Sequence, residues 1–236
     1  MNIPTRFKSL SIILPAYNEE ANIENSVSLA RKAGQEYFDD LEIIVINDGS
    51  TDSTGDILDR LALDANDLRP IHFSENYGYG KALRTGLYLA SCDLVFFTDS
   101  DLQFDLAQIE HLLAWIKDYD IVAGYREHRA DPWLRRVNAW GWRVLVRFVL
   151  GLSIRDIDCA FKLFRREVFV AVQLKSVGAM INTELLVRAQ KEGYRIKEVP
   201  VSHYPRRAGK QTGANLRVIV KAFSELLKMQ SSLQLR

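Results

Sequence analysis

Residues 41–52 read LEIIVINDGSTD, a largely apolar run rich in β-branched residues that ends in a polar turn. The same arrangement occurs at residues 10–20, LSIILPAYNEE, and at residues 93–103, DLVFFTDSDLQ. Short runs of this kind are typical of buried strands. Helix-like periodicity fills the chain between them, so the first half reads as repeated strand–helix units that pack a mostly parallel sheet. The sequence therefore predicts an α/β fold.

Strands and helices are expected to alternate through the first half of the chain. Strands are predicted at residues 10–14, 41–46, 71–73, 93–98 and 121–124. Helices are predicted at about residues 19–38, 51–63, 81–90 and 108–117. The elements predicted after residue 124 are a long apolar helix, a mixed segment, a helix at 182–191, a strand at 196–201 and a basic tail. Because the sequence has no repeat or linker, we expect residues 1–236 to form one domain.

The composition excludes several classes of protein. Of the 236 residues, 47% are hydrophobic, and 4 Trp, 9 Tyr and 11 Phe are among them, which excludes disordered and collagen-like chains. The 31 basic and 30 acidic residues give a net charge of +1, so the chain has no general attraction for nucleic acid. Cys92 and Cys159 have no CxxC spacing and no histidines grouped around them, so we expect buried, reduced thiols.

The sequence does not predict export or insertion into a membrane. The first apolar run, residues 10–14, is interrupted by Ser11 and is too short for the core of a signal peptide. A membrane-spanning helix needs about 18 consecutive apolar residues, and no such run occurs. We therefore expect the protein to be cytoplasmic.

Acidic and amide side chains follow the predicted strand at residues 93–98. In an open α/β sheet the carboxyl ends of the strands form the ligand crevice, and Asp99 and Asp101 would repel each other there without a cation. Together with Gln103 they offer hard oxygen ligands, which suit Mg²⁺ or Mn²⁺ and not zinc. Asp105, in contrast, is expected only to cap the helix that follows.

The open positions of such a cation predict a phosphate-bearing ligand. A divalent ion held by two carboxylates and one amide commonly binds substrate phosphates in its remaining positions, so a nucleoside diphosphate is the natural ligand. The glycines of GYGK, residues 78–81, lack the spacing of a P-loop, and no GxGxxG follows the first strand. Those glycines either contact phosphate or form a tight entry to the next helix.

Three motifs, each after its predicted strand, together resemble those of a known family: PAYNEE (15–20), NDGSTD (47–52) and TDSDLQ (98–103). The chain resembles the inverting family 2 glycosyltransferases of GT-A fold, which implies a three-layer α/β/α sandwich around a mostly parallel sheet. Its second half is similar to the polyprenyl-phosphate sugar transferases, the dolichyl-phosphate mannosyltransferase-like branch. The matching stretches there are GYR (124–126), DIDCAFKLF (156–164), NTEL (182–185), EVPV (198–201) and RRAGK (206–210).

This resemblance covers roughly residues 8–215. It implies a nucleotide-sugar-binding half, residues 1–124, and an acceptor-binding half, residues 125–236. The sequence departs from the family in two ways: Ala160 stands where relatives often have Gly, and the C-terminal membrane helices of many relatives are absent. A separate membrane subunit is the partner that would replace those helices.

The resemblance also implies a role for each matching residue. The nucleotide base and ribose would be framed by Pro15, Tyr17 and Glu19, with Asp48 beside them. The Mg²⁺ or Mn²⁺ ion would be held by Asp99, Asp101 and Gln103. The diphosphate of a UDP- or GDP-linked sugar would be covered by Arg206 and Lys210. The acceptor phosphate would meet Arg126, helped by Arg135 or Arg136, and the further site residue of the second half would be Asp156.

The acceptor decides whether the reaction needs a base. The departing diphosphate carries a negative charge that a divalent ion stabilises. A polyprenyl phosphate of the dolichyl or undecaprenyl type is already largely a dianion at neutral pH, so it needs arginines for positioning and little help from a base. A soluble saccharide or protein would attack through a hydroxyl and would need a base, for which the candidates are Asp156, Asp158 and Glu184. A non-catalytic nucleotide-sugar-binding protein is a third alternative.

Residues 136–152 are predicted to form an amphipathic helix. Its narrow basic stripe, with Trp140 and Trp142 near it, consists of Arg136, Arg143 and Arg147. Its apolar face consists of Val137, Val144, Leu145, Phe148, Val149 and Leu152. Such a helix either lies in a membrane interface with its arginines on anionic headgroups or packs on the core. The resemblance favours the membrane, so we expect a peripheral protein on the cytoplasmic face.

Overall fold

A seven-stranded sheet organises the computed structural model, which describes residues 7–127, 141, 144–178, 180–206, 226 and 229. The strands are β1 (Ser9–Ala16), β2 (Asp40–Asn47), β3 (Leu68–His72), β4 (Leu94–Thr98), β5 (Ile121–Arg126), β6 (Phe161–Arg165) and β7 (Ile196–Val201). Their order is β3-β2-β1-β4-β6-β5-β7, and of these strands β6 alone runs antiparallel to its neighbours. The mostly parallel sheet predicted from the sequence is confirmed.

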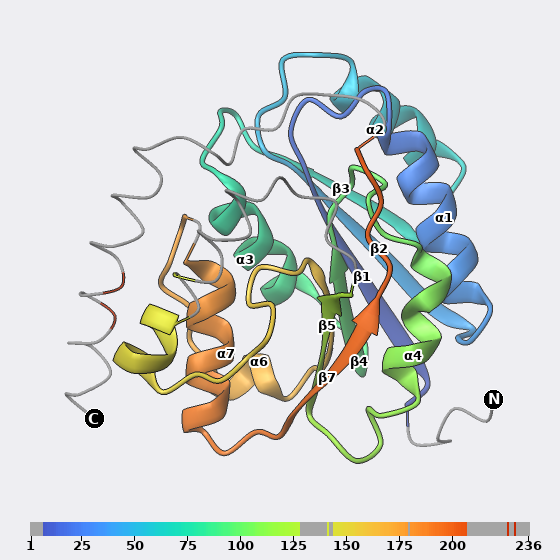
Figure 1. Cartoon of the computed structure of the whole chain (residues 1–236). Helices are drawn as coiled ribbons and strands as arrows, with labels where there is room; N and C mark the ends of the chain where they lie inside the picture. Colours follow the sequence, from blue (N-terminus) through green and yellow to red (C-terminus); the bar gives the residue numbers. More distant parts are fainter. Residues whose placement is uncertain are drawn as a thin grey trace.

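Helices cover both faces of this sheet, as Figure 1 shows. One face carries α1 (Ile23–Gln35), α2 (Thr54–Leu63) and α4 (Ile109–Leu113). The other carries α3 (Tyr79–Leu89) and α7 (Ile181–Lys191). The short elements are the 3-10 turn η1 (Leu106–Gln108) and α6 (Val168–Ala171). The molecule is therefore the three-layer α/β/α sandwich that the resemblance implied.

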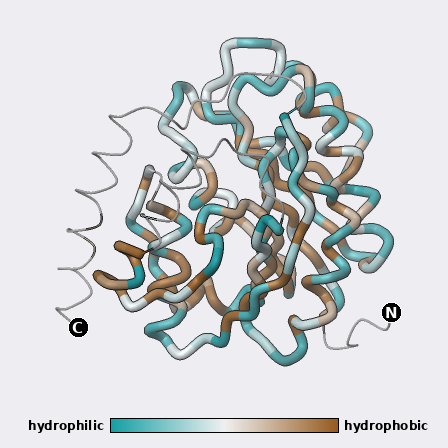
Figure 2. Tube along the Cα trace, in the orientation of Figure 1, coloured by the Kyte–Doolittle hydropathy of each residue, from teal (hydrophilic) through white to brown (hydrophobic). Residues whose placement is uncertain are grey.

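The central strands are buried on both sides because helices cover them. All eight residues of β1 and all five of β4 are buried, which explains why both strands are largely apolar and do not alternate between apolar and charged residues. The covering helix α1 buries Ile23, Val27 and Ala30, which lie on its inner face. In Figure 2 hydrophobic and hydrophilic residues alternate along this helix, as they do in amphipathic helices.

Two predicted helix boundaries shift because local hydrogen bonds compete with the helix. α1 begins at Ile23 and not near Glu19, since residues 20–22 form a turn in which the Asn22 amide donates to the Glu19 carbonyl at 2.8 Å, an i→i−3 bond. The helix predicted at 108–117 is η1 followed by the five-residue α4. Asp105 caps η1, because its carboxylate accepts the Ala107 amide at 3.1 Å, and its predicted structural role is confirmed.

β6 is a strand that the hydrophobic pattern did not predict. It lies between β4 and β5 and is antiparallel to both. Its first residue, Phe161, pairs with Thr98, the last residue of β4. The loop before β6 therefore reaches the same edge of the sheet as the carboxyl ends of the parallel strands, and it brings residues 156–160 to that edge.

The predicted amphipathic helix is described in part. Residues 144–150 are helical, and the helix ends before Gly151, whose φ of 71° favours glycine. Leu152 lies beyond that end, buried in the core, so its predicted place on the apolar membrane face is wrong, whereas Phe148 is 90% exposed. The predicted residues that lie outside the described part are Arg136, Val137, Trp140, Trp142 and Arg143. Among the described helices, none has the length and apolarity needed to cross a bilayer.

Candidate active site

The candidate site lies where β1 and β4 meet, at the carboxyl edge of the sheet. β2 lies on one side of β1 and β4 on the other, so the chain leaves the two strands in different directions and a crevice opens between the loops. The loop after β1 carries Tyr17 and Glu19, and the loop after β4 carries Asp99 and Asp101. The strand order thus brings the predicted polar residues to one edge.

Pro15 and Tyr17, both predicted beside the nucleotide base, have different surroundings. Pro15 is buried in β1, and its carbonyl accepts a hydrogen bond from Ser100 Oγ at 2.8 Å. This bond ties the end of β1 to the turn that carries Asp99 and Asp101. Tyr17 is exposed, so of these two residues it is Tyr17 that offers a ring on which a base could stack.

Asp48 holds the glycine-containing loop in place. Its two carboxylate oxygens accept the amides of Tyr77 and Gly78, each at 2.8 Å, and burial raises the pKa of its carboxyl. Gly78 has a φ of 95° and is the residue from which α3 begins. A Cβ on Gly80 would lie 2.3 Å from the Gly178 carbonyl oxygen. These glycines therefore form a tight entry to α3, which is one of the two alternatives that the sequence left open.

Asp99 and Asp101 form the acidic centre of the site. Asp101 is buried, and the partly exposed Asp99 has a buried Oδ1 without a hydrogen-bond partner among the described residues. Burial of the carboxyl and, second, the charge of Asp101 raise the pKa of Asp99 to about 7, and burial also raises the pKa of Asp101. The positive charges near the two carboxylates therefore do not offset their burial, and a bound cation would favour their ionised forms.

The donor set of this acidic centre fits a hard divalent cation. Asp99, Asp101 and the Gln103 amide offer oxygen ligands of the kind that Mg²⁺ and Mn²⁺ prefer. The described residues contain no group of three or more His, Cys, Asp or Glu side chains arranged to hold a metal, so two carboxylates and one amide would form the protein's share of the coordination. Gln103 Nε2 donates to the Tyr204 carbonyl at 3.0 Å, which fixes the orientation of its amide.

Residues 202–206, directly after β7, lie along the turn that follows β4. The Tyr204 amide donates to the Gln103 carbonyl at 2.8 Å, and Phe104 and His203 form an antiparallel bridge. This contact carries Arg206 to the acidic centre. Its guanidinium pairs with Glu19 through Nη2, and Nη1 lies 3.9 Å from Asp101 Oδ2.

Arg126 and Asp156 form a two-pronged ion pair at the end of β5. Arg126 Nε lies 2.7 Å from one carboxylate oxygen and Nη2 lies 2.8 Å from the other. The Arg126 amide also donates to Asp156 Oδ2, at 3.2 Å. The sequence singled out both residues but did not predict the pair. A carboxylate gripped at both oxygens by a guanidinium is poorly placed to take a proton from an acceptor.

The other two predicted base candidates differ sharply in their surroundings. Glu184 is buried, and its carboxylate accepts the amides of Lys175 and Ser176 at 2.9 and 2.7 Å and Arg188 Nε at 2.7 Å. Although burial opposes ionisation, these hydrogen bonds hold the pKa of Glu184 below its usual value. Glu184 thus holds the segment before α7 in place, which is a structural role. Asp158 is exposed, in the loop before β6.

Lys162 is a site residue to which the sequence analysis gave no role. Its side chain is completely buried, and Nζ donates to the Ile157 carbonyl at 3.0 Å and to the Cys159 carbonyl. Burial lowers the pKa of this ammonium. The bonds fix the loop that carries Asp156. The sequence contained one indication of this buried lysine, since Lys162 lies inside the apolar run FKLF, residues 161–164.

Three of the predicted phosphate-binding residues lie outside the described part of the chain. They are Arg135, Arg136 and Lys210.

The two cysteines have the state that the sequence predicted. Cys92 and Cys159 are both free and buried. Burial raises the pKa of the Cys159 thiol to about 12, so this thiol beside the site stays protonated.

The sequence motifs of this site match a family model. Residues 11–172 match the model described as Glycosyl transferase family 2. The chain belongs to glycosyltransferase family 2. This match spans β1 to the end of α6 and so includes the acidic centre, Arg126 and Asp156.

Curated relatives of this family 2 glycosyltransferase support the assignment. The chain is 36% identical over 207 residues to glycosyltransferase AglD from Haloferax volcanii, covering 84% of the chain and 33% of AglD. It is 27% identical over 221 residues to undecaprenyl-phosphate 4-deoxy-4-formamido-L-arabinose transferase from Proteus mirabilis, covering 91% of the chain and 65% of that protein. The chain thus spans between a third and two thirds of the lengths of these relatives.

The fold of the family 2 chain also matches a solved structure. Glucosyl-3-phosphoglycerate synthase from Mycobacterium tuberculosis, in complex with Mn²⁺, UDP and glucosyl-3-phosphoglycerate, aligns with a TM-score of 0.74 at 22% identity. The alignment covers 95% of this chain and 80% of that one. The likeness confirms the predicted GT-A fold.

Proposed function

We propose that this family 2 glycosyltransferase moves a sugar from a UDP- or GDP-linked donor to a polyprenyl phosphate, with inversion at the anomeric carbon and with Mg²⁺ or Mn²⁺ bound. The observation that carries the proposal is the acidic centre at the junction of β1 and β4, where Asp99 Oδ1 has no hydrogen-bond partner among the described residues and Arg206 lies beside Asp101. Relatives named as undecaprenyl-phosphate sugar transferases support the acceptor class. Solved structures of the fold with UDP and Mn²⁺ or Mg²⁺ support the donor and the metal.

The donor half of the reaction falls to the residues around the acidic centre. Asp99, Asp101 and Gln103 would hold the cation, which when bound supplies positive charge that stabilises the departing diphosphate. Arg206 would exchange its contact with Glu19 for a charge-assisted contact with that diphosphate. Tyr17 would stack on the base at the crevice mouth. Lys210, the other residue assigned to the diphosphate, belongs to the same proposal.

The acceptor half needs positioning more than proton transfer. An oxygen of the acceptor phosphate bonds to the anomeric carbon as the bond from that carbon to the diphosphate oxygen breaks, so no proton has to move. Asp156 and Glu184 are both held in ion pairs, and this favours a phosphate acceptor over a hydroxyl that needs a base. Arg126, fixed by Asp156, would orient the phosphate. Arg135 or Arg136 would assist it.

A soluble saccharide or protein acceptor is the second candidate, and one observation favours it. Asp158 lies exposed in the loop before β6, next to residues of the site, and an exposed carboxylate there could serve as the base that a hydroxyl acceptor requires. The two candidates predict different chemical products. Only a sugar attached to a prenyl chain would partition into organic solvent.

The proposal includes a place for the enzyme in the cell. A single domain, residues 1–236, would act on the cytoplasmic face of a membrane, with residues 1–124 serving the donor and residues 125–236 the acceptor. Phe148, 90% exposed on a helical segment, supports a peripheral membrane contact. A separate membrane subunit is the further partner that this arrangement would accommodate.

The experiment follows a radiolabelled sugar from donor to product. Purified enzyme is incubated with Mn²⁺, polyprenyl phosphate and labelled UDP- or GDP-sugars, and the mixture is extracted with organic solvent. The proposal expects label in the organic phase only when polyprenyl phosphate is present, and none with chelator. Label that stays in the aqueous phase on a saccharide or a protein would favour the second candidate.

A further inference from the structure

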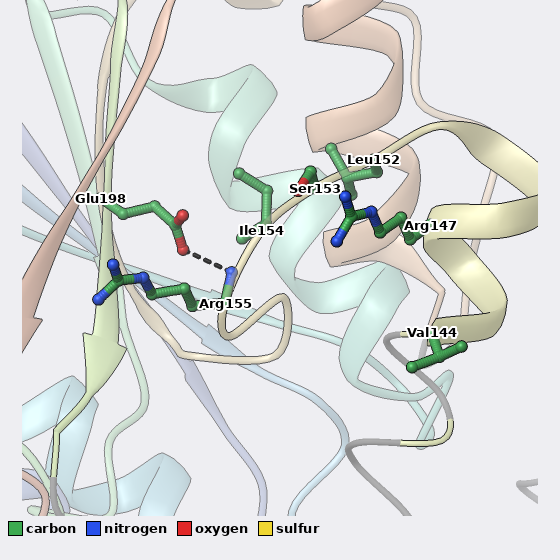
Figure 3. Close-up of a pocket in the computed structure, with 7 residues that line it drawn as sticks. All are labelled: Val144, Arg147, Leu152, Ser153, Ile154, Arg155 and Glu198. Atoms are coloured by element: carbon green, nitrogen blue, oxygen red, sulfur yellow. Dashed lines mark hydrogen bonds between the residues drawn. The ribbon is translucent and has the colours of Figure 1, made fainter.

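A cavity of about 350 Å³ lies beside the helical segment 144–150 and is shown in Figure 3. Its wall is formed by three parts of the chain. Val144 and Arg147 come from the helical segment, residues 152–155 from the chain that follows it, and Glu198 from β7. The site residues Arg126 and Asp156 do not line it.

The charges that line this cavity are predominantly positive. Arg147 reaches toward it from the helical segment, and Arg155 lies on the chain that follows (Figure 3). The Arg155 guanidinium lies over the Tyr125 ring, 4.9 Å from its centroid, which holds this side chain in place. Among the described residues, Glu198 is the one carboxylate of the lining, and it accepts the Arg155 amide at 2.6 Å. The two guanidinium groups and one carboxylate of the described lining favour an anionic occupant.

Apolar groups accompany these charges. Leu152 and Ile154 are buried in the cavity wall. On the helical segment itself Phe148 is 90% exposed and Val144 is 46% exposed. A highly exposed phenylalanine next to an arginine is typical of a segment that rests at a bilayer surface, with its ring among acyl chains and its charge at the headgroups.

We propose that this cavity binds the phosphate headgroup of an anionic phospholipid while Phe148 enters the acyl region of the bilayer. The inference rests on the proposed function, because it gives the membrane contact of that proposal a defined lipid site. The headgroup site is separate from the acceptor phosphate, which the proposed function places at Arg126. It would hold the enzyme on the surface from which it draws its acceptor.

The first test compares two charge reversals on vesicles. Arg147→Glu changes the cavity, and Arg69→Glu changes an exposed arginine of β3, at the opposite edge of the sheet. Each substitution lowers the net charge by the same amount. On phosphatidylglycerol vesicles we expect Arg147→Glu to weaken co-sedimentation at least about fivefold and Arg69→Glu to leave it within about twofold, because only charges near the lipid surface contribute. Equal losses in both variants would overturn the headgroup site.

The second test separates the apolar contact from the charge. Phe148→Ser is compared with Leu63→Ser, since Leu63 is 83% exposed on α2. In high salt, which screens the headgroup attraction, we expect the residual vesicle binding of the parent to persist in Leu63→Ser and to disappear in Phe148→Ser. Parent protein that binds phosphatidylcholine as well as phosphatidylglycerol would overturn the proposal, as would unchanged binding by Phe148→Ser.

A transfer assay in detergent distinguishes failure of this inference from failure of the proposed function. With a short-chain prenyl phosphate in micelles, we expect Arg147→Glu to keep the acceptor KM of the parent. A raised acceptor KM would show that the cavity belongs to the acceptor phosphate and would overturn the headgroup site while transfer itself stood. Absence of transfer by the parent would reject the proposed function, whereas headgroup selectivity on vesicles would still be measured independently.

Discussion

Arg206 bridges Glu19 and Asp101: Nη2 of its guanidinium pairs with the Glu19 carboxylate, and Nη1 lies 3.9 Å from Asp101 Oδ2. Glu19 follows β1, Asp101 follows β4, and Arg206 follows β7. The Arg206 guanidinium thus spans the crevice between the loops that follow β1 and β4. A residue that follows the last strand of the sheet partly neutralises the acidic centre, and the proposed function places the donor diphosphate beside it.

We expect Arg206→Ala to weaken donor binding. A charge-assisted hydrogen bond contributes about 1.5 to 3 kcal/mol, so the Kd of the nucleotide sugar should rise about tenfold or more in titration calorimetry with Mn²⁺. Arg195→Ala is the matched control, because Arg195 is an exposed arginine directly before β7. Equal effects of the two substitutions would contradict a donor role for Arg206.

Asp101→Asn should abolish transfer without destabilising the protein. Burial raises the pKa of Asp101, so its ionised form is disfavoured, and replacing it with a neutral amide should leave the thermal midpoint in chelator unchanged or higher. Transfer should fall at least about 100-fold, as it does when a group that stabilises transition-state charge is lost. Asp105→Asn, which keeps a capping side chain on η1, should retain activity. Full activity of Asp101→Asn in chelator would reject the metal site.

Arg126→Lys should raise the acceptor KM and leave the donor Kd unchanged. Lysine keeps the charge but loses the planar fork that grips both oxygens of Asp156. In a double-mutant cycle with Asp156→Asn, the coupling free energy should be at least about 1 kcal/mol, since the two side chains are in contact. An effect of Arg126→Lys on donor affinity alone would assign Arg126 to the diphosphate.

Glu184→Gln should reduce stability in a pH-dependent way. Hydrogen bonds lower the pKa of Glu184 despite its burial, so its stabilising contribution is present above its unfolded pKa, about 4.3, and is lost as pH falls through the folded pKa. The free energy of unfolding at pH 7 should fall by about 3 kcal/mol because Arg188 loses its buried partner. Urea titrations should show the gap between parent and variant narrowing below pH 4. A gap of constant size from pH 7 to 3 would contradict this assignment.

The positions of the residues proposed to bind the donor could be predicted because their signals are local. Each apolar run marks a strand, and the polar residues that follow it, such as Asp48 and Asp99, must lie at the carboxyl edge once the strands are parallel. The one cap predicted to be structural, Asp105, is also a local feature. Even here the sequence could not show that both carboxylate oxygens of Asp48 accept hydrogen bonds from amides of the loop before α3.

The arrangement of the residues proposed to bind the acceptor could not be predicted, because it depends on the antiparallel strand β6, which the hydrophobic pattern did not reveal. In β6, Lys162 and Arg165 interrupt an apolar run, yet both are buried. Lys162 is accommodated there by loop carbonyls and Arg165 by the carbonyls of Ile116 and Lys117. Asp156 lies in the loop before β6, so its pairing with Arg126 could not be predicted without this strand. β6 is stabilised by hydrogen bonds to residues distant in the sequence, and such bonds leave no local sequence pattern.

The measurement that tests the central claim most directly is a phosphorus NMR spectrum of the complete reaction. Enzyme, Mg²⁺, nucleotide sugar and polyprenyl phosphate are combined, and the phosphorus signals are followed with time. The account predicts that the monoester signal of the polyprenyl phosphate gives way to a phosphodiester signal, with one nucleoside diphosphate released for each phosphodiester formed. Release of nucleoside diphosphate while the polyprenyl monoester stays unchanged would contradict the account.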